Sequence, residues 1–152
     1  MLKFNLRWIL SCLVFVGLNA SAADRATPDQ AVAMVKKAVA FMKENGNEKA
    51  FAAFNNASDP QFRDRDLYIF VYDFHGTNLA HGANAKMIGK NLLEMKDNEG
   101  KAIVKGFIEV ANKSGKGWVD YKWPNPVTKA IESKSSYIEK VDGVIVGSGI
   151  YK

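Results

Sequence analysis

The feature that most constrains the fold lies near the C-terminus, where two strand-forming segments flank a two-residue turn signal. Residues 128–141 and 144–151 carry the strand patterns, and Asp142-Gly143 stands between them. Asp-Gly is among the strongest local signals for a β-hairpin, because a tight turn needs residues that tolerate positive φ. The sequence therefore predicts a long antiparallel hairpin, around which the rest of the chain must pack.

Three further strands are predicted upstream. Residues 67–74 are almost entirely aromatic, branched or aliphatic, which indicates a strand covered on both faces. Residues 79–81 return from the turn at 75–78, and residues 118–123 stop before a Pro-Asn-Pro sequence. Links of hairpin length imply antiparallel pairing, so the five strands predict one antiparallel sheet.

Helices are predicted before the sheet and in its middle. Thr27-Pro28-Asp29-Gln30 combines a capping box with a proline at the first helical position, and apolar residues then recur every three or four positions to residue 42. This predicts an amphipathic helix over 28–44. Asn47 is expected to cap a shorter helix ending near residue 55, and residues 98–112 predict a third helix with a broad apolar face. The elements together indicate a single α+β domain.

The first 23 residues have the pattern of an export signal. Two basic residues precede an apolar run over 8–18, and small residues follow it. The run is shorter than the ~20 residues that a membrane span requires. We expect cleavage after Ala23 or Ala22, which leaves a mature domain over 24–152, periplasmic or secreted. The alternative is an uncleaved anchor.

Cysteine content and charge exclude several classes. Cys12 is the only cysteine, and it falls inside the predicted signal. A mature chain without cysteine has no disulfide, zinc–thiolate site, cysteine nucleophile or c-type haem attachment. The formal net charge of +5 falls to +3 without the signal, and the lysines are scattered. Scattered lysines indicate a solvated surface rather than a nucleic-acid footprint, and the charge is compatible with an anionic ligand.

No motif predicts catalysis. The mature histidines are His75 and His81, and a metal site built from them and Asp73 would lack the close spacing of zinc ligands. The alternative for His75 is an exposed turn residue. There is no Gly-x-Ser-x-Gly elbow. We therefore expect no enzyme activity, no cofactor and no metal.

Lys134 is an unusual residue for the middle of a strand. Its side chain shares a face with Ser136 and Ile138. If that face is buried, the ammonium must be paired, either by a nearby carboxylate or by an exogenous one. The available acids are Asp73, Asp120 and Glu132. Alternatively, Lys134 lies on an exposed face of the sheet, as most strand lysines do.

Tyr121 and Trp123 share one face of the neighbouring predicted strand. They offer a hydroxyl, an indole N–H and apolar walls. A small apolar pocket with a few convergent polar groups is the usual form of a ligand site. These two residues and Lys134 therefore suggest a pocket for a small carboxylate.

Six short segments, in order and at similar spacing, match those of a known family: 68–73 with Gly76, 79–81, 89–91, 117–124, 134–137 and 146–151. Through them the chain resembles the single Cache domains of the second type, which are extracytoplasmic sensor modules of bacterial chemoreceptors and sensor kinases. The resemblance implies a PAS-like α+β fold, in which a long N-terminal helix packs on a five-stranded antiparallel sheet. It also implies binding of a small organic acid such as acetate, propionate, lactate or pyruvate.

The resemblance assigns Lys134 as the counter-ion of the carboxylate, with His81 and Tyr121 as hydrogen-bond donors. Aromatic residues would form the walls. One departure is Gly82, where the family often has proline. Carried over by position, the ligand-binding residues are Tyr68, Phe70, His81, Tyr121, Trp123 and Lys134.

Two functions follow as hypotheses. The first is a stand-alone periplasmic small-molecule-binding domain for signal transduction or chemotaxis, which would act with a separate membrane receptor, sensor kinase or transporter. The second is a non-catalytic interaction or structural module with a vestigial pocket. Binding of an organic acid would distinguish them.

Overall fold

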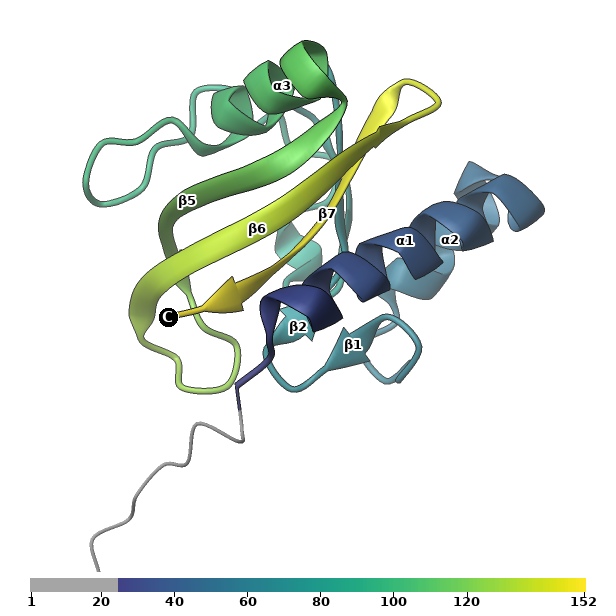
Figure 1. Ribbon diagram of the computed structural model, residues 1–152, viewed down its shortest axis with the longest axis horizontal. Coiled ribbons are helices and arrows are strands. Elements are labelled where there is room, and N and C mark those ends of the chain that lie inside the picture. Colours follow the sequence, from purple (N-terminus) through teal and green to yellow (C-terminus); the bar gives the residue numbers. More distant parts are fainter. Residues whose placement is uncertain (1–24) are drawn as a thin grey trace, which may run out of the picture.

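The computed structural model describes residues 25–152, so the predicted export signal lies outside the described residues. Figure 1 shows a twisted sheet with helices on both of its faces. The elements, in chain order, are α1 (Pro28–Asn45), α2 (Asn47–Asn55), β1 (Arg63–Asp64), β2 (Leu67–Tyr68), β3 (Phe70–Asp73), β4 (Asn78–His81), the 3-10 turn η2 (Ala85–Met87), α3 (Ile103–Ser114), β5 (Lys116–Pro124), β6 (Ile131–Val141) and β7 (Val144–Tyr151).

The main sheet has five antiparallel strands in the order β4-β3-β7-β6-β5, which confirms the predicted α+β fold class. The Asp142-Gly143 turn has positive φ at both residues, 43° and 81°. It pairs Val141 with Val144 and extends the hairpin as far as the pair Lys134 and Tyr151. β1 and β2 form a separate two-stranded sheet that the sequence did not predict.

α1 crosses one face of the sheet over β7 and β6, while α3 packs on the opposite face against β5 (Figure 1). Both faces are therefore covered in the centre, which explains why residues 67–74 are apolar at successive positions. The core under α1 includes Val35, Phe54, Ile69 and Val71. The core under α3 includes Tyr68, Phe70, Phe107, Tyr121 and Ile138.

The predicted capping box at the start of α1 is present. The Thr27 hydroxyl accepts a bond from the Gln30 backbone N–H at 3.3 Å, and the Gln30 side chain accepts one from the Thr27 N–H at 2.9 Å. Asn47 was predicted as the cap of α2, and that prediction is wrong. Gly46 occupies the cap position without a side-chain bond, because its φ of 78° provides the sharp break between the two helices.

Two predicted boundaries also shift, and in both cases a side chain organises a turn. α3 begins at Ile103 rather than at residue 98, because Asp97 Oδ1 accepts the backbone N–H groups of Glu99 and Lys101. β6 begins at Ile131 rather than at 128, because Asn125 accepts N–H groups from the preceding loop. Such local side-chain bonds compete with helix and strand.

Two glycines of β7 allow close contact between layers. A Cβ at Gly147 would overlap the ring of Phe70, and one at Gly149 would overlap Ser136. The ring of Phe70 thereby packs against β7 at Gly147 and stacks on Phe107 of α3, with ring centroids 5.2 Å apart. The glycines thus make room for residues of the core under α3.

Packing of α1 on the sheet generates the first prediction. Val35 is fully buried and Lys36 is exposed. We expect Val35→Asp to lower the free energy of unfolding by roughly 3–5 kcal/mol, because it places an unpaired carboxylate in an apolar interface. Lys36→Asp, the matched control, should change it by less than about 0.5 kcal/mol. Urea denaturation measures both, and equal losses would contradict the assigned face.

Candidate functional site

A small cavity lies on the α3 side of the sheet, and five of the six predicted ligand residues line it. Its volume of about 10 Å³ is near the minimum that holds one water molecule. The lining is almost wholly aromatic or aliphatic. It consists of Tyr68, Phe70, Tyr72, His81, Met95, Ile103, Phe107, Tyr121 and Trp123.

Strand register brings these residues together from distant parts of the chain. Phe70 of β3 pairs with His81 of β4. Across the other half of the sheet, Lys134 of β6 pairs with Tyr121 on β5 and with Tyr151 on β7. Residues opposite each other in adjacent strands project to the same face. Tyr121, Lys134 and Tyr151 therefore form one cross-strand row beside the cavity.

Lys134 is only 1% exposed, so the alternative of an exposed strand lysine is wrong. Its ammonium donates to the hydroxyl of Tyr68 at 2.7 Å and to that of Tyr151 at 3.4 Å. The Nζ atom also lies 4.0 Å from the Tyr68 ring centroid and 4.8 Å from that of Tyr151. Aromatic faces attract a cation. Lys134 does not line the small cavity itself and contacts it through Tyr68.

None of the three carboxylates considered from the sequence pairs with Lys134. Asp120 binds Lys152 at 3.0 Å, and Glu132 binds Arg25 at 3.1 Å. Asp73 accepts backbone N–H groups within its own turn. Within residues 25–152, the hydrogen bonds of the Lys134 ammonium go to neutral phenols alone.

The electrostatics follow from this burial. Loss of hydration holds the pKa of Lys134 well below its ordinary value of 10.5, and the charge of Asp66 opposes that shift. Asp66 is itself buried, and its Oδ1 accepts the backbone N–H of Ala26 at 3.2 Å. Burial raises the pKa of Tyr68 well above 10, so its phenol stays protonated. The site is thus a buried amine that donates to neutral phenols.

His81 is held as a neutral hydrogen-bond donor. Its Nδ1 accepts backbone N–H groups from Ala83 at 3.3 Å and from Asn84 at 3.0 Å, which assigns the ring proton to Nε2. Burial, reinforced by the charge of Lys134, lowers the pKa of His81 to about 3. The ring centroid lies 5.0 Å from that of Tyr68 and 6.5 Å from that of Trp123.

Two aromatic residues of β5 complete the wall. The Tyr121 hydroxyl lies 2.8 Å from Ser136 Oγ, and its ring packs edge-on against Phe107 and Trp123. The indole of Trp123 partly opposes the rise that burial causes in the pKa of Tyr68, which places it near the Tyr68 hydroxyl. The same hydroxyl accepts a bond from the ammonium of Lys134, which lies behind the cavity wall.

Asp73, His75 and His81, weighed as a metal set, have separate structural roles. Asp73 organises a turn, His75 is exposed in it, and His81 is buried against Tyr68. No group of three or more metal-ligating side chains occurs among residues 25–152.

Sequence reasoning missed several residues of the site. Tyr151, which contacts Lys134 and does not line the cavity, could have been predicted, because the Asp142-Gly143 turn sets the register that places Tyr151 opposite Lys134. Met95 and Ile103 had no such signal, because they lie in or next to an irregular segment. Phe107 was predicted to be apolar helix surface, but nothing in its spacing identified the cavity.

A five-stranded antiparallel sheet with a long helix on one face and an aromatic cavity on the other is the architecture of PAS-like sensor domains, and solved structures of this kind superpose on the chain. A methyl-accepting chemotaxis protein from Vibrio parahaemolyticus aligns with a TM-score of 0.71 and 26% identity, over 81% of this chain and 86% of the other. A Cache chemosensory domain studied for carboxylic acid recognition also aligns with a TM-score of 0.71. The two are 22% identical, and the alignment covers 81% of this chain and 91% of that domain.

The chain belongs to the single Cache domain 2 family, whose family model matches residues 23–152. It is 36% identical over 89 residues to the sensor histidine kinase MctS of Rhizobium johnstonii, covering 57% of this chain and 19% of the kinase. It is 33% identical over 90 residues to the methyl-accepting chemotaxis protein McpP of Pseudomonas putida, covering 58% of this chain and 16% of the receptor. The matches thus span less than a fifth of these signalling proteins. Within residues 25–152, no helix is long and apolar enough to cross a bilayer.

The second prediction concerns pH. Unfolded His81 gains a proton as the pH falls below about 6.5, whereas folded His81 gains it only near pH 3. The free energy of unfolding therefore decreases as the pH is lowered through this window, by at most roughly 1.4 kcal/mol per pH unit. Between pH 7.5 and pH 5.0 we expect His81 to account for a loss of up to roughly 2 kcal/mol.

Urea denaturation of His81→Gln at pH 7.5 and pH 5.0 tests whether His81 causes this loss of stability. The variant should lose less stability on acidification than the parent. The exposed residue His75 provides the matched control, and His75→Gln should retain the parental pH dependence. An unchanged pH dependence in His81→Gln would show that another group is responsible.

Proposed function

We propose that this protein is a periplasmic sensor domain that binds a small organic acid and signals its presence rather than catalysing a reaction. Its ligands would be carboxylates of the size of acetate, propionate, lactate or pyruvate. It would act with a separate membrane receptor, sensor kinase or transporter. The observation that carries the proposal is the buried ammonium of Lys134, which contacts phenols and no carboxylate within the described residues.

A bound carboxylate would supply what this ammonium lacks. A buried cation needs a charged partner to offset its lost hydration, and a charge-assisted hydrogen bond is stronger than a neutral one. The Tyr68 hydroxyl accepts from Lys134 and still carries its own O–H, so it and the Nε2–H of His81 offer two neutral donors beside the cavity. Lys134 would thus act as counter-ion, with Tyr68, His81 and Tyr121 as hydrogen-bonding groups.

The size of the cavity favours small acids. Its present volume of about 10 Å³ means that an acid must displace part of the wall. Met95 and Trp123 are the half-buried members of the lining, so they are the side chains that would move without opening the sheet. The apolar remainder, Phe70, Phe107 and Ile103, would contact a short hydrocarbon tail and repel a long polar one.

The comparisons support the class of ligand and the signalling role. One superposable domain is described for carboxylic acid recognition, and the curated relatives are a sensor kinase and a chemotaxis receptor. The predicted export signal supports a periplasmic location.

The direct experiment is thermal unfolding of the mature chain with a panel of organic acids. A ligand at 100 times its dissociation constant should stabilise it by about 2.7 kcal/mol. No stabilisation by any acid would favour the interaction module with a vestigial pocket.

The third prediction is that Lys134→Met weakens binding of the preferred acid about ten- to a hundredfold, because it removes a charge-assisted bond. The fold should remain intact or become more stable, because methionine needs no compensation for lost hydration. Isothermal calorimetry measures the affinity. Lys36→Met, on the exposed side of α1, is the control. Unchanged affinity in the Lys134 variant would refute its role as counter-ion.

A further inference from the structure

A second and larger chamber adjoins the small cavity. It has a volume of about 250 Å³, and it shares Tyr68, His81 and Trp123 with the small cavity. These three side chains form the partition between the two spaces. The remaining lining comes from the segment after β4, the end of β5 with the loop that follows it, and one residue of β1: Ala83, Asn84, Pro124, Asn125, Pro126, Lys129 and Arg63.

The chamber is lined by two cations and by no acidic residue. Arg63 donates from Nη1 to the carbonyl of Gly82 at 2.8 Å, and Lys129 donates from Nζ to the carbonyl of Pro126 at 2.6 Å. Neither forms an ion pair within residues 25–152. A guanidinium carries five N–H donors and an ammonium three, so both have donors left for a ligand.

The carboxylate of Glu132, which is hydrogen-bonded to the lining residue Asn125, forms no ion pair with Arg63 or Lys129. Asn125 Nδ2 donates to Glu132 at 3.1 Å, but Glu132 is already bound by Arg25 and by the Thr128 hydroxyl. The chamber therefore keeps an excess of positive charge next to a wall of aromatic and amide groups.

The backbone at Lys129 supports a role for this residue. It has a φ of 64°, which is unfavourable for a lysine, and the buried Asn125 holds the loop in this shape by accepting the Lys129 N–H at 2.9 Å. Unfavourable backbone conformations persist where surrounding structure enforces them, and they concentrate at ligand-binding sites. The loop thus keeps Lys129 at the chamber despite a conformational cost.

We propose that the outer chamber is an anion subsite for a second carboxylate, so that the protein prefers a short dicarboxylic acid over the monocarboxylic acid of equal length. This inference rests on the proposed function: one carboxylate is received near Lys134 and His81, and the other by Arg63 and Lys129. His81 and Trp123, which line both spaces, would flank the carbon chain that joins the two carboxylates.

The fourth prediction compares succinate with butyrate, which have four carbons each and differ in the second carboxylate. We expect the mature chain to bind succinate at least tenfold more tightly in calorimetry. Lys129→Asn removes the cation and suits the left-handed backbone, because asparagine tolerates positive φ. It should weaken succinate about tenfold and change butyrate less than twofold. Lys36→Gln removes one charge elsewhere, and it should alter neither affinity.

The outcomes separate the two proposals. Butyrate bound as tightly as succinate, or Lys129→Asn weakening both acids equally, would overturn the anion subsite and leave the proposed function standing. A third outcome is that Lys129→Asn weakens succinate binding while Lys134→Met does not. That result would support the anion subsite and overturn the inner carboxylate site. Binding of neither acid would overturn the preference for dicarboxylates, and the wider acid panel would then decide on the proposed function.

Discussion

Burial of the Lys134 ammonium is the constraint on which the site depends. An amine with 1% exposure in the centre of a sheet is costly unless polar groups surround it, and Tyr68 and Tyr151 supply them from β2 and β7. Antiparallel register places Tyr151 and Tyr121 on either side of it. The glycines at 147 and 149 then allow the aromatic layer to close over the same face. The arrangement leaves the Lys134 ammonium bonded to phenols and to no carboxylate within residues 25–152, with the charge of Asp66 acting on it only from outside bonding distance.

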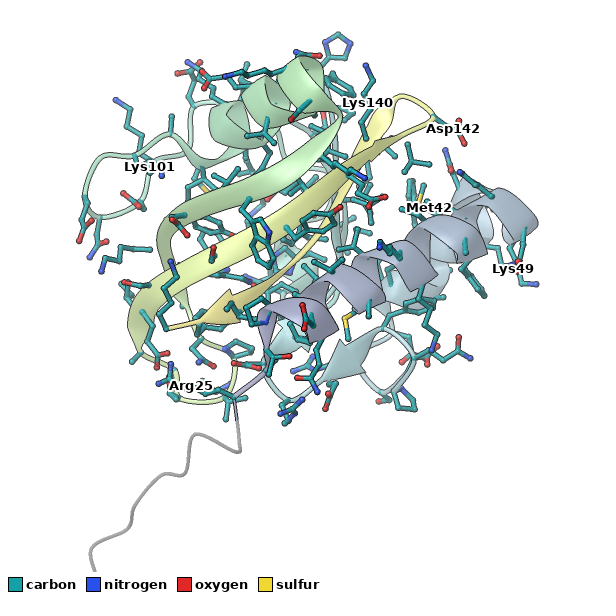
Figure 2. The ribbon with its side chains drawn as sticks, in the orientation of Figure 1. Arg25, Met42, Lys49, Lys101, Lys140 and Asp142 are labelled. Atoms are coloured by element: carbon teal, nitrogen blue, oxygen red, sulfur yellow. The ribbon has the colours of Figure 1, made fainter. Side chains whose placement is uncertain are left out.

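The strand that carries Lys134 also joins the two ends of the described chain. Glu132, two residues before Lys134, binds Arg25, and Arg25 also donates to the carbonyl of Lys152 at 3.0 Å. Figure 2 shows Arg25 on the segment that leads into α1, near the end of β7. On the other side, Asp66 links the surroundings of Lys134 to Ala26. The segment just before α1 is therefore bonded at two residues, Arg25 and Ala26, to groups near Lys134.

Much of the fold could be predicted because its signals are local. The capping box at Thr27 and the turn at Asp142-Gly143 each act within a few residues, and the structure contains both. The apolar run predicted as one strand over 67–74 is extended but divides at Ile69 into β2 and β3, which belong to different sheets. The errors came from side chains that reorganise turns, such as Asp97 ahead of α3. The site was harder to predict, because its parts meet only through register and through an irregular segment. Sequence spacing located Tyr121 and Lys134, but it gave no indication of Met95 or of the chamber beside Lys129.

The central claim is that Lys134 is a buried amine whose missing partner is a carboxylate. The most direct test follows the Lys134 side-chain resonances by NMR through a pH titration, with and without a bound acid. Without acid, the pKa of Lys134 should lie below its ordinary value of 10.5, because burial disfavours the charged form. With acid bound, the pKa should rise, because the carboxylate favours the ammonium. A Lys134 that titrates near 10.5 and does not respond to any acid would contradict the account.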